Sequence, residues 1–180
     1  MQALRTARLV LDTPRETDIP AVFAACSDPE ILRWIPLPEP YTRESAEFFV
    51  RSYVPHGLAS GRFTVWGIRE SETSPLIGVV EVRRDDAPGA ASLGCWLTPA
   101  ARRGGVMTEA LTAVCAHALD PEGLGFERLH WEYLPGNEVS RRLAEAVGFD
   151  FSGVEPHTID FRGEQRQSLR GELSRDGLRG

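Results

Sequence analysis

The residues best suited to chemistry form one short segment near the middle of the chain, Arg102-Arg103-Gly104-Gly105, which is followed by a helical pattern. Glycines ahead of a helix let the backbone approach a ligand closely, and the first amides of a helix have no partner within it. The helix dipole adds about half a positive charge at the same place. The segment therefore favours a phosphate or diphosphate group, although an ordinary turn between a strand and a helix would show the same pattern.

Other side chains that often carry chemistry are poorly arranged for it. The four histidines show no HxxH or HExxH spacing, so no metal site is predicted. The three cysteines (Cys26, Cys95 and Cys115) form no CxxC pair, which argues against a zinc ribbon or a disulfide framework and favours the cytoplasm. All 20 residues counted as Lys or Arg are arginine, so lysine chemistry of the Schiff-base or Walker type is excluded.

Length and charge narrow the class of protein further. A chain of 180 residues suits one domain, expected over residues 1–173, with 174–180 as a flexible C-terminal tail. With 20 basic and 26 acidic residues the net charge is −6, which suits a cationic substrate and disfavours nucleic acid. The longest apolar run, Ala21–Cys26, is far shorter than the ~20 residues that span a bilayer. The first residues hold no apolar stretch typical of a signal peptide.

The loop must be positioned by a sheet and its flanking helices. Alternation and turn signals predict strands at 8–11, 63–68, 76–83, 92–97 and 128–133, and two more within 150–173. Helical spacing and caps predict helices from Thr17 or Asp18 to Cys26, from Thr42 to about Pro55, over 107–118 and over 138–147. Three consecutive strands favour a mixed, largely antiparallel sheet over a doubly wound parallel one.

Local signals also predict how the first helices begin and end. Asp28-Pro29 is expected to end the first helix, and the stretch 34–41, with three prolines, is expected to be an extended loop. Thr42 is expected to cap the second helix. Its capping box is predicted to be incomplete, because Ser45 stands where a glutamate or glutamine would close it.

The glycine segment and its flanks resemble the GNAT superfamily of N-acetyltransferases, in particular its RimJ/RimL-like branch. That superfamily carries an R/Q-x-x-G-x-G/A acetyl-CoA loop, which Arg102 and Gly105 match. The flanking runs Gly94-Cys95-Trp96-Leu97 and Thr108-Glu109-Ala110-Leu111 look like the "GYWL…TEAL" frame of this bacterial-type branch.

A second match lies downstream of the first. Asn137-x-x-Ser140, followed by Gly148-Phe149, resembles the N-x-x-S…GF helix of the family. The N-terminal run Arg8-Leu9-Val10-Leu11 and the proline-rich loop 34–41 also look like this branch. The motifs stand in the expected order, and the resemblance covers nearly the whole chain. It implies an N-acetyltransferase that uses acetyl-CoA as co-substrate and no metal.

The resemblance also implies a fold and a binding mode. The fold is α/β (α+β), with a mixed, mostly antiparallel sheet of six to seven strands flanked by helices. The fourth and fifth strands splay apart, and the pantetheine arm lies between them against the backbone of Trp96 and Leu97. Asn137 would contact the pantetheine amide. The loop residues implied in acetyl-CoA binding are Arg102, Arg103, Gly104, Gly105, Val106, Met107 and Thr108.

Three positions depart from the family pattern. Met107 replaces the usual glycine or alanine, so the end of the loop must hold a longer side chain. Ser92 stands where many relatives have a glutamate, and Ala144 where many have a tyrosine that protonates the leaving thiolate. Two usual catalytic candidates are therefore missing.

Amine acetylation needs a proton acceptor, an oxyanion donor and a proton donor. Only the unprotonated amine attacks a thioester, and Glu132 is the first candidate base, with Glu81 next. Related ribosomal-protein acetyltransferases also place a glutamate five residues before the equivalent of Asn137, although Glu132 would equally suit an ion pair. The backbone N–H near Leu97 is the implied oxyanion donor. Ser140 is the implied acid and CoA contact, or else a first-turn residue bonded to backbone.

The acceptor is a primary amine, either a protein N-terminus or a small molecule, which attacks directly in a ternary complex. Trp34, Tyr41 and Tyr133 are expected to line its side of the site, although aromatic residues there would equally serve a core. One alternative is another acyl donor such as succinyl-CoA, whose distal carboxylate the extra arginines would recognise. Another is a non-catalytic CoA-binding module, suggested by the missing tyrosine and glutamate. Homodimers are frequent in this branch.

Overall fold

Eight strands form one sheet in the order β1-β2-β3-β4-β5-β6-β8-β7 in the computed structural model, which describes residues 1–179. In chain order they are β1 (Leu4–Arg5), β2 (Val10–Asp12), β3 (Phe63–Arg69), β4 (Gly78–Arg84), β5 (Ala90–Leu97), β6 (Arg128–Tyr133), β7 (His157–Phe161) and β8 (Glu164–Ser174). All neighbours are antiparallel except β5 and β6. The predicted mixed sheet is confirmed. The two-residue β1, which pairs with β2, is the one strand beyond the predicted seven.

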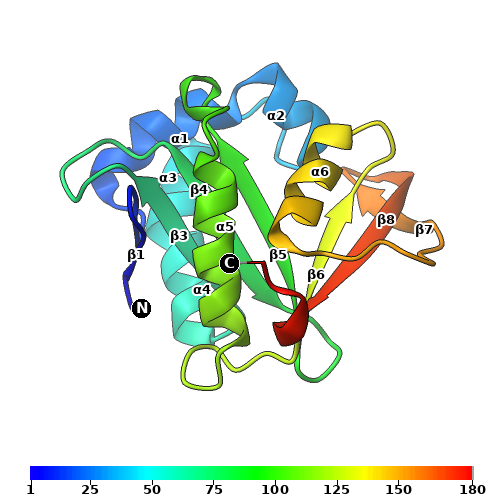
Figure 1. Cartoon of the computed structure of the whole chain (residues 1–180). Helices are drawn as coiled ribbons and strands as arrows, with labels where there is room; N and C mark the ends of the chain where they lie inside the picture. Colours follow the sequence, from blue (N-terminus) through cyan, green and yellow to red (C-terminus); the bar gives the residue numbers. More distant parts are fainter. Residues whose placement is uncertain (180) are drawn as a thin grey trace.

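Helices cover both faces of the sheet (Figure 1). They are α1 (Ile19–Cys26), α2 (Pro29–Trp34), α3 (Arg43–Phe48), α4 (Val54–Ser60), α5 (Val106–Leu119) and α6 (Glu138–Val147). In Figure 1, α5 and α6 lie in front of the sheet, while α1, α3 and α4 lie behind it. The sheet therefore has two differently covered faces, and each strand's alternate side chains point to opposite ones.

Each face has its own hydrophobic core. The first core cluster lies under α5 and α6 and includes the fully buried Leu11, Trp66, Leu111, Val114 and Leu129. The second core cluster lies under the N-terminal helices and includes Val22, Ala46, Val65, Val79 and Trp96. Along β5, Cys95 and Leu97 border the first cluster and Trp96 belongs to the second. Because side chains alternate along a strand, this shows which face of the sheet every other residue of β5 occupies.

Asp28-Pro29 begins a helix as well as ending one, contrary to the predicted plain break. The Asp28 side chain accepts from the amide of Glu30 and so caps α2, with the proline in the first turn where its missing N–H is harmless. The capping box at Thr42 is complete, because the Ser45 hydroxyl accepts from the Thr42 amide at 3.4 Å. The predicted incomplete box is therefore wrong, because the Ser45 hydroxyl takes the place that a glutamate or glutamine side chain usually has.

The second predicted helix does not end near Pro55. It continues through a π-helical turn, Phe49–Tyr53, into α4, which reaches Ser60. The amide of Val54 bonds to the carbonyl of Phe49, five residues back, so the ladder shifts by one residue just before the proline. This wider turn admits Pro55 into the first turn of a new segment instead of ending the helix.

The end of the chain folds back onto the domain. A short 3-10 turn, Arg175–Gly177, follows β8, and the Arg175 guanidinium donates to the carbonyl of Leu119. The amide of Arg179 donates to the carbonyl of Val147 at 3.0 Å. The tail that is expected to be flexible, 174–180, thus contacts the domain through Arg175 and Arg179, and its last residue, Gly180, lies outside the described residues. None of the helices in residues 1–179 is long and apolar enough to cross a membrane.

Candidate active site

The loop between β5 and α5 has the backbone conformation that glycines allow. Arg103, Gly104 and Gly105 have successive φ angles of 80°, 74° and 75°, in the left-handed region that favours glycine. A Cβ added at Gly104 would meet no atom within 4 Å, so conformation and not crowding requires glycine there. Gly105 precedes α5, and its carbonyl accepts from the amide of Glu109 at 3.0 Å.

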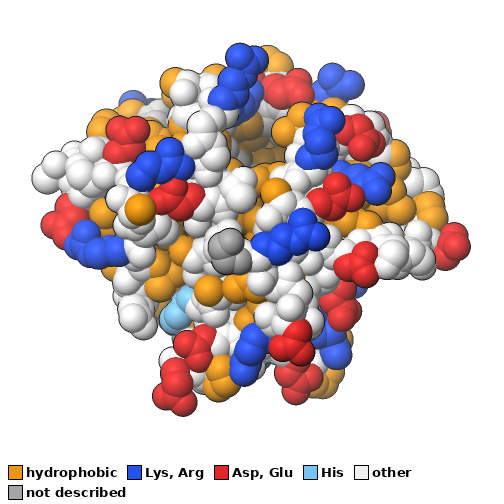
Figure 2. Space-filling view, viewed as in Figure 1, with side chains coloured by type: hydrophobic (Ala, Val, Ile, Leu, Met, Phe, Trp, Pro, Cys, Tyr) orange, Lys and Arg blue, Asp and Glu red, His pale blue; other side chains and the backbone are white. Residues whose placement is uncertain are grey.

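The amides that follow are available to a ligand. Among the described residues, the amides from Arg103 to Thr108 donate to no protein acceptor. Consecutive free donors at the start of a helix form an anion site. Figure 2 shows the surface hollowed between the start of α5 and α6, with hydrophobic side chains on its floor and basic side chains at its rim. The loop therefore offers a row of free backbone donors of the kind that binds anions.

The side chains at the start of α5 serve the fold. Met107 is only 7% exposed and belongs to the first core cluster, and Val106 packs against that cluster. The longer side chain at the departure from the family pattern is thus accommodated in the core. Of these two residues, only the backbone amides remain free to bind a ligand.

The two loop arginines have different surroundings. Arg102 forms an ion pair with Asp28, the residue that caps α2, and so links the loop to the N-terminal helices. Arg103 is exposed and has no ion-pair partner among residues 1–179. A phosphate would therefore meet the free charge of Arg103, whereas the charge of Arg102 is already neutralised.

The gap expected between the fourth and fifth predicted strands is present between β5 and β6. These strands are paired over only three positions, from Ala90↔Arg128 to Ser92↔His130. Beyond Ser92 they separate (Figure 1), so the β6 side of the end of β5, with Trp96 and Leu97, has no strand partner. Unpaired strand edges can accept an extended molecule as if it were another strand.

The start of α6 faces this gap. The Asn137 side-chain oxygen accepts from the amide of Ser140 at 3.2 Å and caps the helix. The Trp131 indole donates to the Ser140 hydroxyl at 2.9 Å. Because an indole N–H can only donate, the hydroxyl accepts there and its own hydrogen remains available to a third group. The Ser140 hydroxyl is therefore free to donate one hydrogen bond.

Glu132 lies on β6, on the opposite face from Trp131, and is tied to two basic side chains. Its Oε1 accepts from Nε and Nη2 of Arg170 at 2.8 and 2.5 Å and lies 3.1 Å from Nε2 of His157. Its Oε2 has no hydrogen-bond partner among the described residues. The ion pair considered as the alternative role is thus present, and one oxygen remains free to accept a proton.

Glu81 lies on β4, on the same face of the sheet as Glu132. Its Oε1 accepts from the Tyr53 hydroxyl at 2.8 Å and from Arg83 at 2.7 Å. Burial, reinforced by the Glu81 charge, raises the pKa of Tyr53, so the phenol stays protonated and donates. The sequence indicated Glu81 but not Tyr53, because nothing local links a helix residue to a strand 28 positions later.

The three aromatic residues expected on the acceptor side are placed differently. Tyr41 is 8% exposed in the second core cluster, and Tyr133 is 6% exposed in the first, so both serve cores. The alternation of Tyr133 with Glu132 already indicates opposite faces. Trp34 does border the gap, because a Cβ added to Gly136, beside Asn137, would lie 3.8 Å from its ring.

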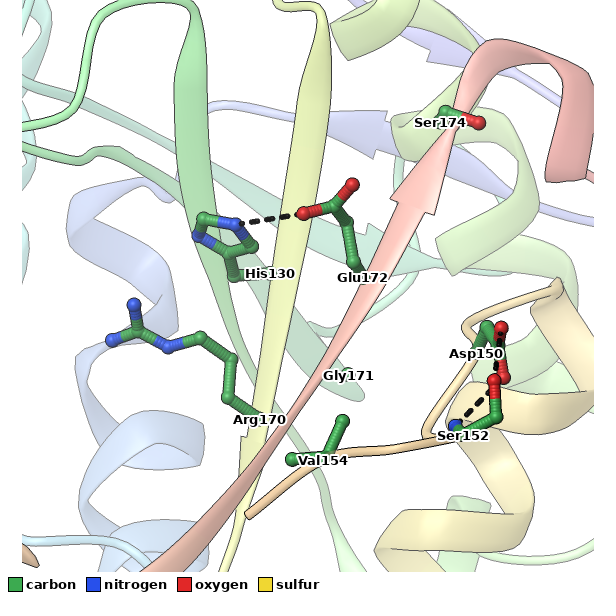
Figure 3. Close-up of a pocket in the computed structure, with 8 residues that line it drawn as sticks. All are labelled: His130, Asp150, Ser152, Val154, Arg170, Gly171, Glu172 and Ser174. Carbon is green, nitrogen blue, oxygen red and sulfur yellow. Dashed lines mark hydrogen bonds and ion pairs between the residues drawn. The ribbon is translucent and has the colours of Figure 1, made fainter. Parts of the chain in front are cut away.

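A polar pocket of about 370 Å³ lies along β8, and no motif in the sequence indicated it. Its lining residues are His130, Asp150, Ser152, Val154, Arg170, Gly171, Glu172 and Ser174. Figure 3 shows His130, Arg170 and Glu172 on one side of the strand, and Asp150 and Ser152 on the other. These groups do not converge on one point. No cluster of three or more potential metal ligands occurs within residues 1–179.

Comparison with known proteins agrees with this geometry. The family model described as an acetyltransferase (GNAT) domain matches residues 8–150. YoaA of Bacillus subtilis (strain 168), named as an uncharacterized N-acetyltransferase, is 28% identical over 152 residues, or 84% of each chain.

Two solved structures share the fold. RimL, described as a ribosomal L7/L12 alpha-N-protein acetyltransferase in complex with coenzyme A, has a TM-score of 0.82 at 18% identity and covers 98% of this chain and 99% of its own. MccE, the microcin C7 self immunity acetyltransferase in complex with acetyl-CoA and AMP, has a TM-score of 0.80 at 16% identity, covering 94% and 93%. Because the family model spans most of the chain, this protein belongs to the GNAT family of N-acetyltransferases, with RimL among its structural neighbours.

Proposed function

We propose that the protein transfers the acetyl group of acetyl-CoA to a primary amine by direct attack in a ternary complex. The observation that carries the proposal is the row of free amides from Arg103 to Thr108 beside the unpaired edges of β5 and β6. The amides fit a diphosphate and the strand edges fit an extended pantetheine arm. The coenzyme A and acetyl-CoA held by RimL and MccE support the same donor here.

Each element of the site has a role in holding the donor. The amides of the loop bind the diphosphate, and Arg103 adds a charge-assisted contact. The backbone of Trp96 and Leu97 hydrogen-bonds to the arm. The Asn137 side-chain nitrogen donates to a pantetheine carbonyl, because its oxygen is already used by the Ser140 amide. The backbone N–H near Leu97 stabilises the developing oxyanion.

Glu132 is the proposed proton acceptor. An alkylamine is mostly protonated at neutral pH and must lose a proton before it attacks. Arg170 and His157 hold the carboxylate through Oε1, which leaves Oε2 to accept that proton directly or through water. As the C–S bond breaks, Ser140 donates its free hydrogen to the leaving thiolate and regains a proton through water from the attacking nitrogen, which must lose its second proton at this point. Glu81, also with one oxygen free, is the second candidate base.

A covalent intermediate on a cysteine is not needed and is disfavoured. Cys95, on β5 next to Trp96, is the cysteine closest in sequence to the proposed arm site. Burial raises the pKa of its thiol to about 12, so the thiolate that would attack a thioester is scarce at neutral pH. Direct attack by the amine is therefore the simpler course.

The acceptor is a primary amine on a protein N-terminus or on a small molecule. RimL is named for a ribosomal protein substrate and MccE for microcin self immunity, so this fold is associated with acceptors of both sizes. The net charge of −6 suits an acceptor that is cationic in solution. Nothing in the site requires a nucleic acid.

The donor proposal is tested by unfolding with and without acetyl-CoA. At about 100 times its dissociation constant the ligand should stabilise the protein by about 2.7 kcal/mol. Gly105→Val should abolish this gain, since a side chain at φ 75° distorts the loop. Gly163→Val is the matched control, because Gly163 has a φ of 81° in the remote β7–β8 turn. Equal stabilisation of both variants would refute the placement of the diphosphate.

The transfer reaction is tested by thiol release from acetyl-CoA over a panel of primary amines. Glu132→Gln should lower kcat by about 10²-fold or more while leaving acetyl-CoA affinity unchanged. A fully active variant would transfer the role to Glu81, which Glu81→Gln checks in the same assay. Succinyl-CoA as donor examines the acyl group, and an absence of turnover with every amine would leave only a CoA-binding module.

A further inference from the structure

Gly94 occupies an unusual place in the sheet. It lies in the middle of β5, on the face that carries Trp96, yet it is exposed where the neighbouring residues of the strand are buried or half-buried. The N-terminal helices that cover Trp96 therefore leave an opening over Gly94. A glycine in a strand interior weakens the strand and often marks a point where a ligand approaches the backbone.

The fold itself gives no reason for glycine at this position. Other glycines of residues 1–179 have either a positive φ, as at Gly61 and Gly163, or a close neighbour, as at Gly57 and Gly171. Gly94 alone among them has an ordinary φ and no atom within 4 Å of an added Cβ. A methyl side chain would meet no atom there and no backbone strain, so the fold itself does not require the side chain of this position to be missing.

Two carboxylates flank the opening. Gly94 is paired with Glu81 of β4, and paired residues carry their side chains on the same face. On the other side, continuing the β5–β6 register past Ser92↔His130 would bring Glu132 opposite Gly94, but the strands have separated by then. Glu81 and Glu132 thus lie on either side of a position that has no side chain, and each has one oxygen without a hydrogen bond.

We infer that Gly94 is the specificity-determining position over which the amine-bearing end of the acceptor crosses β5, between Glu81 and Glu132. The charges of the two carboxylates are paired with Arg83 and Arg170, but the free oxygen of each can accept a hydrogen bond from a primary amine. An amine that enters the gap between β5 and β6 from the face of Trp96 reaches the end of β5. The acetyl donor is proposed to lie beside the same end of β5. The inference rests on the proposed function and specifies where its acceptor enters.

The test introduces side chains that the fold accepts and the acceptor does not. Gly94→Ala and Gly94→Val are compared with wild type using n-butylamine, phenethylamine and a tripeptide with an N-terminal glycine. We expect unchanged acetyl-CoA affinity, an equal or higher Tm, and an acceptor KM raised about tenfold by alanine and further by valine. Gln165→Val, on an exposed position of β8, is the control and should leave all three quantities unchanged.

The outcomes separate the inference from the function on which it rests. An acceptor KM unchanged in Gly94→Val would overturn the inference alone. Loss of acetyl-CoA affinity would also overturn it, because Gly94 would then serve the donor. No turnover of any probe by wild type would refute the proposed function and the inference with it. If the KM of the tripeptide rises in the Gly94 variants, the acceptor is a protein N-terminus. If the KM of the small amines rises, the acceptor is a small molecule.

Discussion

Arg8 and Glu109, 101 positions apart in the sequence, form a hydrogen-bonded ion pair at the start of α5. Nε of Arg8 donates to Oε2 at 2.7 Å, and its backbone amide donates to Oε1 at 3.1 Å. The same guanidinium donates to the Gly104 carbonyl at 3.1 Å. Because the C=O and N–H of a trans peptide point in opposite directions, this bond directs the Gly105 amide away from Arg8. Arg8 also neutralises a carboxylate in the first turn of the helix.

Arg8→Gln should therefore weaken acetyl-CoA binding about tenfold, a loss of the order expected for one charge-assisted hydrogen bond. The Gly104 carbonyl loses its donor and the Glu109 charge is left uncompensated beside the loop. Calorimetric titration measures the affinity. Arg51→Gln, which breaks an exposed ion pair with Glu16, is the matched control and should change nothing. Equal affinities for both variants would show that Arg8 does not position the loop.

The same cluster predicts a dependence of stability on pH. The Thr6 hydroxyl, followed by Arg8, lowers the pKa of Glu109 below its ordinary value of 4.5. A carboxyl with a lowered pKa stabilises the folded state above its unfolded pKa, and this contribution disappears as the pH falls through the folded value. The difference in unfolding free energy between wild type and Glu109→Gln should thus shrink from pH 7 to pH 3. If the difference in unfolding free energy stays constant from pH 7 to pH 3, the pKa of Glu109 is not lowered by the fold.

Ser140→Ala should lower kcat by about 10²-fold, the lower end of the range for general acid–base groups. Acetyl-CoA affinity should change little, because the cap of α6 uses the amide of this residue and not its hydroxyl. The Tm should fall, because the indole N–H of the buried Trp131 loses its acceptor. Steady-state kinetics and thermal unfolding measure the two effects. Wild-type kcat in the variant would exclude Ser140 as the proton donor and leave water as the donor.

Arg69→Met should destabilise the fold by about 3–5 kcal/mol, because it removes one partner of a buried ion pair. Arg69 is 1% exposed and bonds to Asp12 at 2.8 Å and to Asp18 at 2.8 and 2.5 Å, joining β3 to the start of α1. Arg5→Gln breaks an exposed pair with Glu72 and should cost less than about 1 kcal/mol. Urea unfolding compares them, and equal midpoints would contradict the prediction.

The local features of the site could be predicted from the sequence. The glycines before α5, the bounds of α6 and the alternation along β6 are set by backbone preferences within a few residues, and the structure has each where it was expected. The π-helical turn before Pro55 was not predicted, because the same local preferences indicate the end of a helix at a proline. A proline usually ends a helix. Here Val50 in the turn and Val54 after it are buried in the second core cluster, a contact that the local sequence does not reveal.

Contacts across the sheet were decided by the tertiary structure alone. Glu132 meets Arg170 and His157, 38 and 25 positions away, because β6, β8 and β7 adopt one particular register. Arg102 meets Asp28 of the N-terminal helices, and Tyr41 enters a core. Spacing along the chain reports which face a residue occupies, whereas its partner depends on which strands lie side by side. For that reason the sequence indicated the loop and the candidate base, and only the fold placed Gly94 between two carboxylates.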